Sequence, residues 1–119
     1  VDFDGTIVTH EYPMIGRDIG AFEWLKKFQK NGAKLIIYTM RSGKELVDAI
    51  DFCHDKGINF WGINTNPEQK LWTNSPKAYA HLFIDDAAFG CPLMYIEGNR
   101  SYANWNITGP TVLNMLKQN

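Results

Sequence analysis

Short apolar segments alternate with helix-like segments along this 119-residue chain, and this alternation limits the possible folds more than any other feature. Ala33–Met40 and Ile58–Ile63 have the length and the apolar, β-rich composition of buried strands. Strands that alternate with helices are typical of βαβ units, in which helices cover both faces of a parallel sheet. We therefore predict an α/β fold: a single domain over residues 1–119, built as a Rossmann-like three-layer sandwich with a mainly parallel sheet and no cap domain.

The remaining elements follow from apolar spacing and from capping residues. Further strands are expected at Val1–Phe3, Leu82–Ile84 and Leu93–Ile96. Helices are expected from a cap at Asp18 to about Asn31, from Gly43 to Lys56 after a cap at Ser42, and from Pro110 to Lys117. The polar stretch Asn64–Pro76 is expected to be irregular, with a short helix running from Pro76 to Ala80. The chain begins inside a predicted strand, so we expect residues to precede Val1 in the native protein.

Acidic and polar side chains stand where several of these strands end. Asp2 and Asp4 are two residues apart, so in a strand they point to the same face. Thr39 comes near the end of the second strand, and Asp85 and Asp86 follow the fourth. In a parallel sheet these ends meet at one edge, which is where open α/β sheets bind ligands. The sequence therefore predicts one site that gathers these residues.

Carboxylates held close together repel one another unless a cation lies between them. Oxygen ligands without a nearby Cys or His favour Mg²⁺ over zinc. We therefore predict Mg²⁺ as the cofactor, with Asp2, Asp4, Asp85 and Asp86 as candidate metal-site residues.

Charge and composition narrow the range of partners. The net charge of −1 provides no basic field for holding nucleic acid, and no apolar run approaches the length of a membrane span. Cys53 and Cys91 match no metal-binding or redox spacing. We expect both thiols to be reduced and the protein to be cytoplasmic. Trp24 and Trp105 are assigned to packing.

Four segments, in order, resemble the motifs of the haloacid dehalogenase (HAD) superfamily. Asp2-Phe3-Asp4-Gly5-Thr6 is similar to the first motif, and Leu35-Ile36-Ile37-Tyr38-Thr39 to the second. Lys77 resembles the lysine of the third motif, and Leu82-Phe83-Ile84-Asp85-Asp86 resembles the fourth. The segments between them have no room for an independently folded lid, so the resemblance is to a small, capless member.

The resemblance implies a Mg²⁺-dependent phosphomonoester hydrolase that acts through an aspartyl-phosphate. Asp2 is then the nucleophile, and Asp4 is the general acid and then the base. Mg²⁺ bridges the Asp2 carboxylate, the Asp4 backbone carbonyl and a fourth-motif acid. Thr39 and Lys77 contact phosphoryl oxygens, and Met40 and Arg41 are placed with them in substrate binding. Arg41 can equally be a solvated charge at the helix end.

Several alternatives stay open at this stage. Lys70 competes with Lys77 for the third-motif role, and either Asp85 or Asp86 can be the direct metal ligand. A HAD-like phosphate- or nucleotide-binding module that has lost turnover is the second function, motivated by the apolar residues after Asp86. A receiver-type phosphoacceptor domain fits less well, because its acids and lysine come in a different order. The phosphorylated substrate is not identified. A capless site is open to water, so a homodimer is possible. His10 could overhang the site from the loop that follows the nucleophile.

Overall fold

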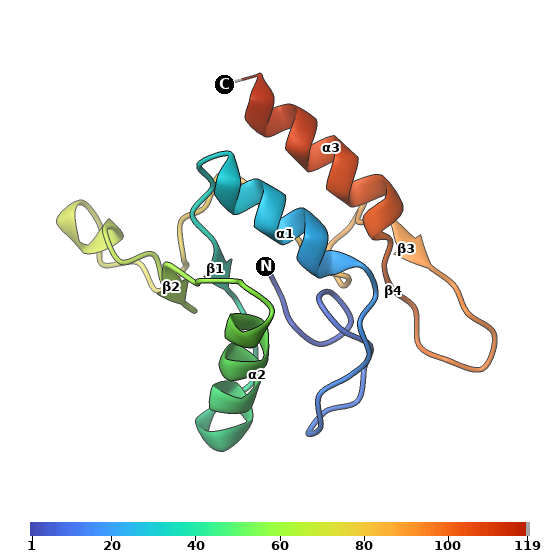
Figure 1. The fold of residues 1–119 in the computed structure, drawn as a ribbon. Helices are drawn as coiled ribbons and strands as arrows, with labels where there is room; N and C mark the ends of the chain where they lie inside the picture. The colour runs from blue at the N-terminus through green and yellow to red at the C-terminus, as the bar shows by residue number, and fades with distance from the viewer. Residues whose placement is uncertain (119) are drawn as a thin grey trace.

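The computed structural model describes residues 1–118, so Asn119 of the predicted domain lies outside the described residues. Within that range it contains three α-helices, one 3₁₀ turn and two short sheets (Figure 1). In chain order these are α1 (Ala21–Lys30), β1 (Ile36–Ile37), α2 (Gly43–Asp55), β2 (Gly62–Ile63), η1 (Gln69–Leu71), β3 (Leu93–Met94), β4 (Tyr102–Ala103) and α3 (Trp105–Lys117). No helix among the described residues is both long enough and apolar enough to span a membrane.

Each of the two sheets has two strands of two residues. β1 pairs with β2 in parallel, with Ile36 opposite Gly62. β3 pairs with β4 in antiparallel fashion, with Leu93 opposite Ala103. The predicted Rossmann-like three-layer sandwich is therefore wrong. Residues 1–118 form a small α+β protein in which no parallel sheet extends beyond the β1–β2 pair.

The predicted first strand meets its neighbours through isolated hydrogen bonds. The Tyr38 amide donates to the Val1 carbonyl at 2.8 Å, and the Asp2 amide donates to the Ile84 carbonyl at 2.9 Å. The ladder stops there because the chain turns back at Phe3. Its carbonyl accepts hydrogen bonds from the backbone N–H groups of Thr6, Ile7 and Val8. The segments expected to be strands thus lie side by side without forming a continuous sheet.

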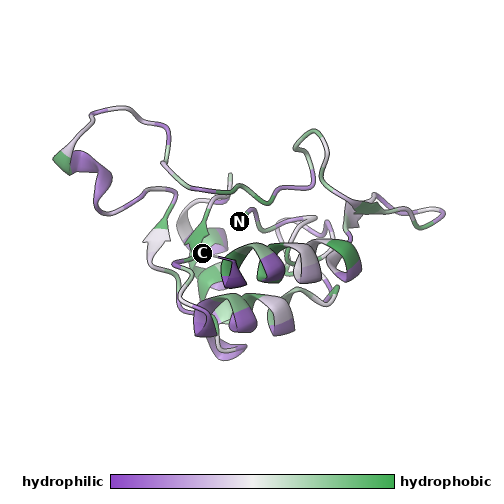
Figure 2. Ribbon diagram, turned by 90° about the horizontal axis from the view of Figure 1, so that it is seen from above, coloured by the Kyte–Doolittle hydropathy of each residue, from purple (hydrophilic) through white to green (hydrophobic). Residues whose placement is uncertain are grey.

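The region before Asp85 also differs from the prediction. Leu82–Ile84 forms no strand, and Leu82 and Phe83 are 41% and 42% exposed. A parallel strand needs cover on both faces, which these two side chains lack. The helix predicted from Pro76 to Ala80 is absent. Residues 64–84, which we call the arm, contain η1 as their only helical turn. Figure 2 shows this arm and the β3–β4 hairpin projecting to opposite sides of the helices.

The helices match the predictions to different degrees. α2 ends one residue before the predicted end. α1 begins three residues after Asp18, because the Asp18 carboxylate accepts the Gly20 N–H and holds a turn in front of the helix. α3 begins five residues before Pro110, since the Asn104 side chain accepts the Asn106 N–H and caps the helix there. Pro110 therefore lies inside α3.

The core joins α1 and α3, which lie side by side in Figure 1. Leu25 and Phe28 of α1 and Trp105 of α3 are buried, and the rings of Phe28 and Trp105 are 6.2 Å apart. The Trp105 indole N–H also donates to the Thr6 carbonyl at 2.7 Å. The packing role predicted for Trp105 is confirmed. This bond ties the helical core to the turn that follows Asp4.

Candidate metal and phosphate site

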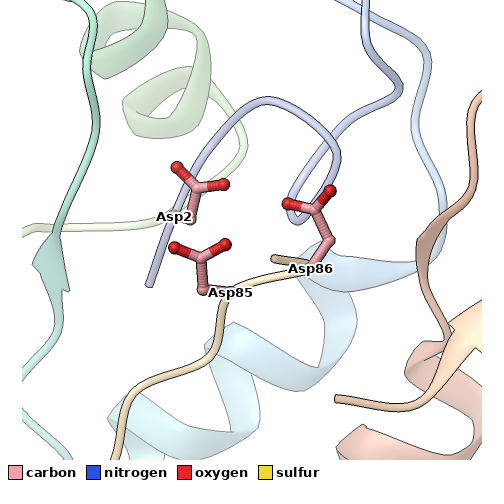
Figure 3. A group of neighbouring side chains, drawn as sticks. All are labelled: Asp2, Asp85 and Asp86. Atoms are coloured by element: carbon pink, nitrogen blue, oxygen red, sulfur yellow. The ribbon is translucent and has the colours of Figure 1, made fainter. Parts of the chain in front are cut away.

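Three carboxylates that are distant in the sequence converge in the structure. Asp2, Asp85 and Asp86 each offer one oxygen, and these oxygens lie within 4.8 Å of one another. All three side chains are half-buried. Figure 3 shows Asp2 on the N-terminal segment facing the neighbouring pair. The hydrogen bond from the Asp2 amide to the Ile84 carbonyl holds the two segments together.

The Asp2 carboxyl is strongly perturbed by these surroundings. Burial is the larger cause and the adjacent Asp85 carboxylate the second, and together they raise the pKa of Asp2 from 3.8 to about 7. A shift in this direction means that a negative charge is disfavoured at Asp2 when no cation is present. The cluster thus has the electrostatic character of a cation site.

Thr6 connects two of the three acids. Its hydroxyl oxygen lies 3.2 Å from Asp2 Oδ2 and 3.0 Å from Asp86 Oδ1, and it accepts the Asp86 N–H at 2.9 Å. A hydroxyl carries a single hydrogen, so it can donate to only one of the two carboxylates at a time. Thr6 was included in the first HAD motif from the sequence, but no role in the site was assigned to it. Its position four residues after Asp2, at the start of a turn, was the available signal.

His10 completes the polar network around Asp86. Its Nε2 lies 3.0 Å from Asp86 Oδ2, and both side chains are mostly buried. Gly5 leaves room for this contact, because a Cβ at that position would overlap the His10 ring. The predicted loop residue His10 therefore reaches the acid cluster from the side.

The donor set fits a hard divalent cation. Mg²⁺ prefers oxygen ligands at about 2.0–2.1 Å, so opposite ligands lie about 4.2 Å apart. The separation of at most 4.8 Å in the cluster is slightly larger than this span. Small side-chain rotations would close the three oxygens around one ion. Asp2, Asp85 and Asp86 are accordingly the residues that could hold Mg²⁺.

The structure does not bring the Asp4 carboxylate into this cluster. Both of its oxygens are bound by Arg41, with Nε to Oδ2 and Nη2 to Oδ1 each at 2.8 Å. The hydrogen bonds that Arg41 donates to Asp4 raise the pKa of Arg41 above its ordinary value, so the guanidinium stays charged. Asp2 and Asp4 thus lie in different environments although they are two residues apart.

Arg41 has no N–H left for a substrate. It is 2% exposed, which excludes the solvated helix-end charge considered from the sequence. Besides Asp4, its guanidinium donates to the backbone carbonyls of Pro13, Met14 and Glu45. These contacts use all five guanidinium donors. Arg41 is therefore a structural anchor in this conformation.

Thr39 and Met40 follow Tyr38, whose amide donates to the Val1 carbonyl of the N-terminal segment. The Thr39 amide donates to Asn64 Oδ1 at 2.7 Å, and its hydroxyl oxygen accepts the Arg41 N–H at 3.1 Å. The hydroxyl hydrogen of Thr39 has no acceptor in the described part of the chain, so it is available to a ligand. Met40 is 99% exposed and contributes no polar contact.

Lys77 is exposed and has no carboxylate partner within residues 1–118. Its Nζ lies 5.9 Å from the centre of the Phe83 ring. Lys77 also lines a cavity of about 260 Å³, together with Trp72, Tyr79 and Phe83. The structure thus places this lysine on the arm that leads to Asp85, outside the acid cluster.

Comparison with known proteins found a similar solved structure. No protein-family model matches the chain, and the comparison with curated proteins found no match. A solved structure described as that of a conserved protein from Bacteroides thetaiotaomicron is similar, with a TM-score of 0.73 and 37% sequence identity. The match covers 98% of this chain and 86% of that one. The chain belongs to the same family as this conserved Bacteroides protein.

Proposed function

We propose that this protein is a Mg²⁺-dependent phosphomonoester hydrolase of the HAD type, acting through an aspartyl-phosphate. The observation that carries the proposal is the convergence of Asp2, Asp85 and Asp86 within 4.8 Å. Their position in the chain matches the first and fourth HAD motifs. Magnesium held by these three residues would offset the negative charge of both the phosphate and the attacking carboxylate.

Asp2 is the proposed nucleophile. Its carboxylate oxygen forms a bond to phosphorus while the bond between phosphorus and the leaving oxygen breaks, and water later hydrolyses the acyl phosphate. A cation held by these residues would lower the pKa of Asp2, opposing the effect of burial and of Asp85, so that the nucleophile would stay ionised. The free hydroxyl hydrogen of Thr39 is suited to donate to a phosphoryl oxygen. Lys77 is the proposed source of positive charge for the phosphoryl group, and this role requires its segment to approach the acids, because its Nζ lies 5.9 Å from the centre of the Phe83 ring in this conformation.

The second candidate function is a phosphate-binding module without turnover. The Arg41–Asp4 pair favours it, because both Asp4 oxygens that would pass a proton to the leaving group are bound to a buried cation. Hydrolysis then requires Asp4 to leave Arg41 during the reaction. A binding module requires no such movement.

Turnover of a generic aryl phosphate tests the proposal. We expect Mg²⁺-dependent hydrolysis that is lost by roughly 10³-fold or more in Asp2→Asn. Asp48→Asn is the matched control, since Asp48 lies on α2 and pairs with Lys44 instead of the cluster. Full activity in Asp2→Asn would exclude Asp2 as the nucleophile.

Metal binding separates the two candidates. Calorimetric titration with Mg²⁺ should show one site that is weakened in Asp85→Asn and in Asp86→Asn but not in Asp48→Asn. Binding of Mg²⁺ and inorganic phosphate without hydrolysis across a broad substrate panel would favour the binding module. Absence of Mg²⁺ binding would contradict both.

A cytoplasmic location accompanies the proposed activity. Cys53 and Cys91 are both free, and Cys53 is fully buried. Burial raises the pKa of Cys53 to about 12, which keeps the thiol protonated and unreactive. Free thiols are typical of a reducing compartment.

A homodimer that covers the open acid cluster is part of the same proposal.

A further inference from the structure

A cavity of about 290 Å³ opens beside the acid cluster. It lies between the loop that follows Thr9 and the β3–β4 hairpin, which Figure 1 shows on the same side of the molecule. His10 belongs to both sites: it lines this cavity and its Nε2 contacts Asp86 at 3.0 Å. A phosphate held at the acids would therefore extend its organic group toward this cavity. We call it the His10 pocket.

Charged groups in the His10 pocket balance one another. Arg17 and Arg100 line it, and so do Glu11 and Asp18. Neither arginine forms an ion pair within residues 1–118. Two positive and two negative side chains provide no net attraction for a second anionic group. They do provide both donors and acceptors.

The remaining walls of the pocket are apolar or weakly polar. Tyr102, Ile19 and Ile96 line it together with Asn99. Its volume is close to the lower end of the range of about 300–1,000 Å³ found for small-molecule sites. The hydroxyl groups of a ligand can donate hydrogen bonds to carboxylates and can accept them from guanidinium and amide groups. An aromatic side chain can stack on a ring of the ligand.

We infer that the His10 pocket binds the hydroxyl-rich organic group of a sugar or polyol phosphate, and that this class is the substrate. The inference rests on the proposed function, because it takes the phosphate to be held at Asp2, Asp85 and Asp86. Arg17 and Arg100 act as hydrogen-bond donors to the polyol, and Glu11 acts as an acceptor. His10 positions Asp86 and forms the wall between the phosphate and the pocket.

Binding to the Asp2→Asn protein in the presence of Mg²⁺ tests this assignment without turnover. Titration calorimetry would compare ribose 5-phosphate, phenyl phosphate and inorganic phosphate. Two additional hydrogen bonds should make ribose 5-phosphate bind at least about tenfold more tightly than either of the others. Phenyl phosphate is the matched control for size, because its ring has no hydroxyl groups.

Variants of the pocket provide the second comparison. Arg17→Ala combined with Arg100→Ala, both at exposed positions, should bring the affinity for ribose 5-phosphate to within about threefold of that for phosphate, since these bonds are lost. Lys56→Gln, at the end of α2, should keep the full preference. Circular dichroism spectra verify that the variants are folded.

The possible outcomes separate the two proposals. If all three ligands bind with Mg²⁺ but ribose 5-phosphate has no advantage, the pocket assignment is overturned while the proposed function stands. If the advantage persists in the double variant, the pocket assignment is likewise overturned. If no ligand binds with Mg²⁺ either to Asp2→Asn or to the wild type, which keeps all three acids, the proposed function fails and the pocket assignment fails with it.

Discussion

Arg41 donates two hydrogen bonds of 2.8 Å to the Asp4 carboxylate, although the two residues are 37 positions apart in the chain. Arg41 is 2% exposed. Its guanidinium packs on the aromatic ring of Phe3, and the guanidinium carbon lies 4.9 Å from the centre of that ring. The pair fastens the segment after β1 to the turn that follows Asp2. The position of this turn then determines how the Asp2 carboxylate is oriented toward Asp85 and Asp86.

Replacing Arg41 with lysine should therefore destabilise the fold. A lysine cannot reproduce the two-bonded geometry, and it leaves the Asp4 carboxylate partly unpaired. We expect a loss of roughly 3 kcal/mol in the free energy of unfolding, measured by urea denaturation. Arg17→Lys, an exposed arginine without an ion pair, is the control and should change stability by less than about 0.5 kcal/mol. Equal effects of the two substitutions would contradict an anchoring role for Arg41.

The pH dependence of stability should report the state of Asp2. The folded-state pKa of about 7 lies above the ordinary value of 3.8, so the folded protein binds the proton more tightly than the unfolded chain. The stabilisation from this proton is full below about pH 4 and is lost as the pH rises toward about 7. In EDTA, wild type should lose stability relative to Asp2→Asn across this interval. Parallel stability curves for the two proteins would refute the expectation.

Gly5 should be required for the acid network. Its φ of +81° disfavours any side chain, and a Cβ would overlap the His10 ring. Gly5→Ala should therefore separate His10 from Asp86 and weaken Mg²⁺ binding. Gly90→Ala is the matched control, because Gly90 has φ +87° with no atom within 4 Å of the added Cβ. Both variants carry a backbone cost of about 1–2 kcal/mol, but only Gly5→Ala should alter metal affinity in calorimetry.

The two lysines that precede Asp85 can be distinguished by kinetics. Lys77→Met should lower kcat for aryl phosphate hydrolysis by about 10²-fold, because a positive charge that stabilises the transition state is lost. Lys70→Met is the control: Lys70 lies on η1, and that change should leave the rate within about twofold. A larger effect at Lys70 would reverse the assignment.

Sequence reasoning was most successful for residues whose role is local. The apolar period of α2 located it to within one residue, because a helix closes its hydrogen bonds within the segment. The extended segments were identified as neighbours, but their two-residue pairing was not foreseen. Sheet formation depends on the covering of both faces by distant residues, and the exposure of Leu82 and Phe83 is invisible in a local pattern.

The residues of the acid site likewise fall into those that the sequence identified and those that only the structure revealed. Asp2, Asp85 and Asp86 were recognisable as candidates from their positions after apolar segments, whereas the roles of Thr6 and His10 depend on contacts made across 80 and 76 positions. The alternation of a strand also predicted that Asp2 and Asp4 share one face. That prediction fails because the chain turns at Phe3, and Arg41 then binds Asp4 away from the cluster.

By itself, then, the sequence determined which carboxylates are available for a cation and where α2 lies, since both are properties of residue type and short-range spacing. Only the tertiary structure decided which acids meet and which is bound by an arginine. Those outcomes depend on where a buried guanidinium and a turn place side chains that are far apart in the chain. Burial and charge pairing act through space, and no local pattern encodes them.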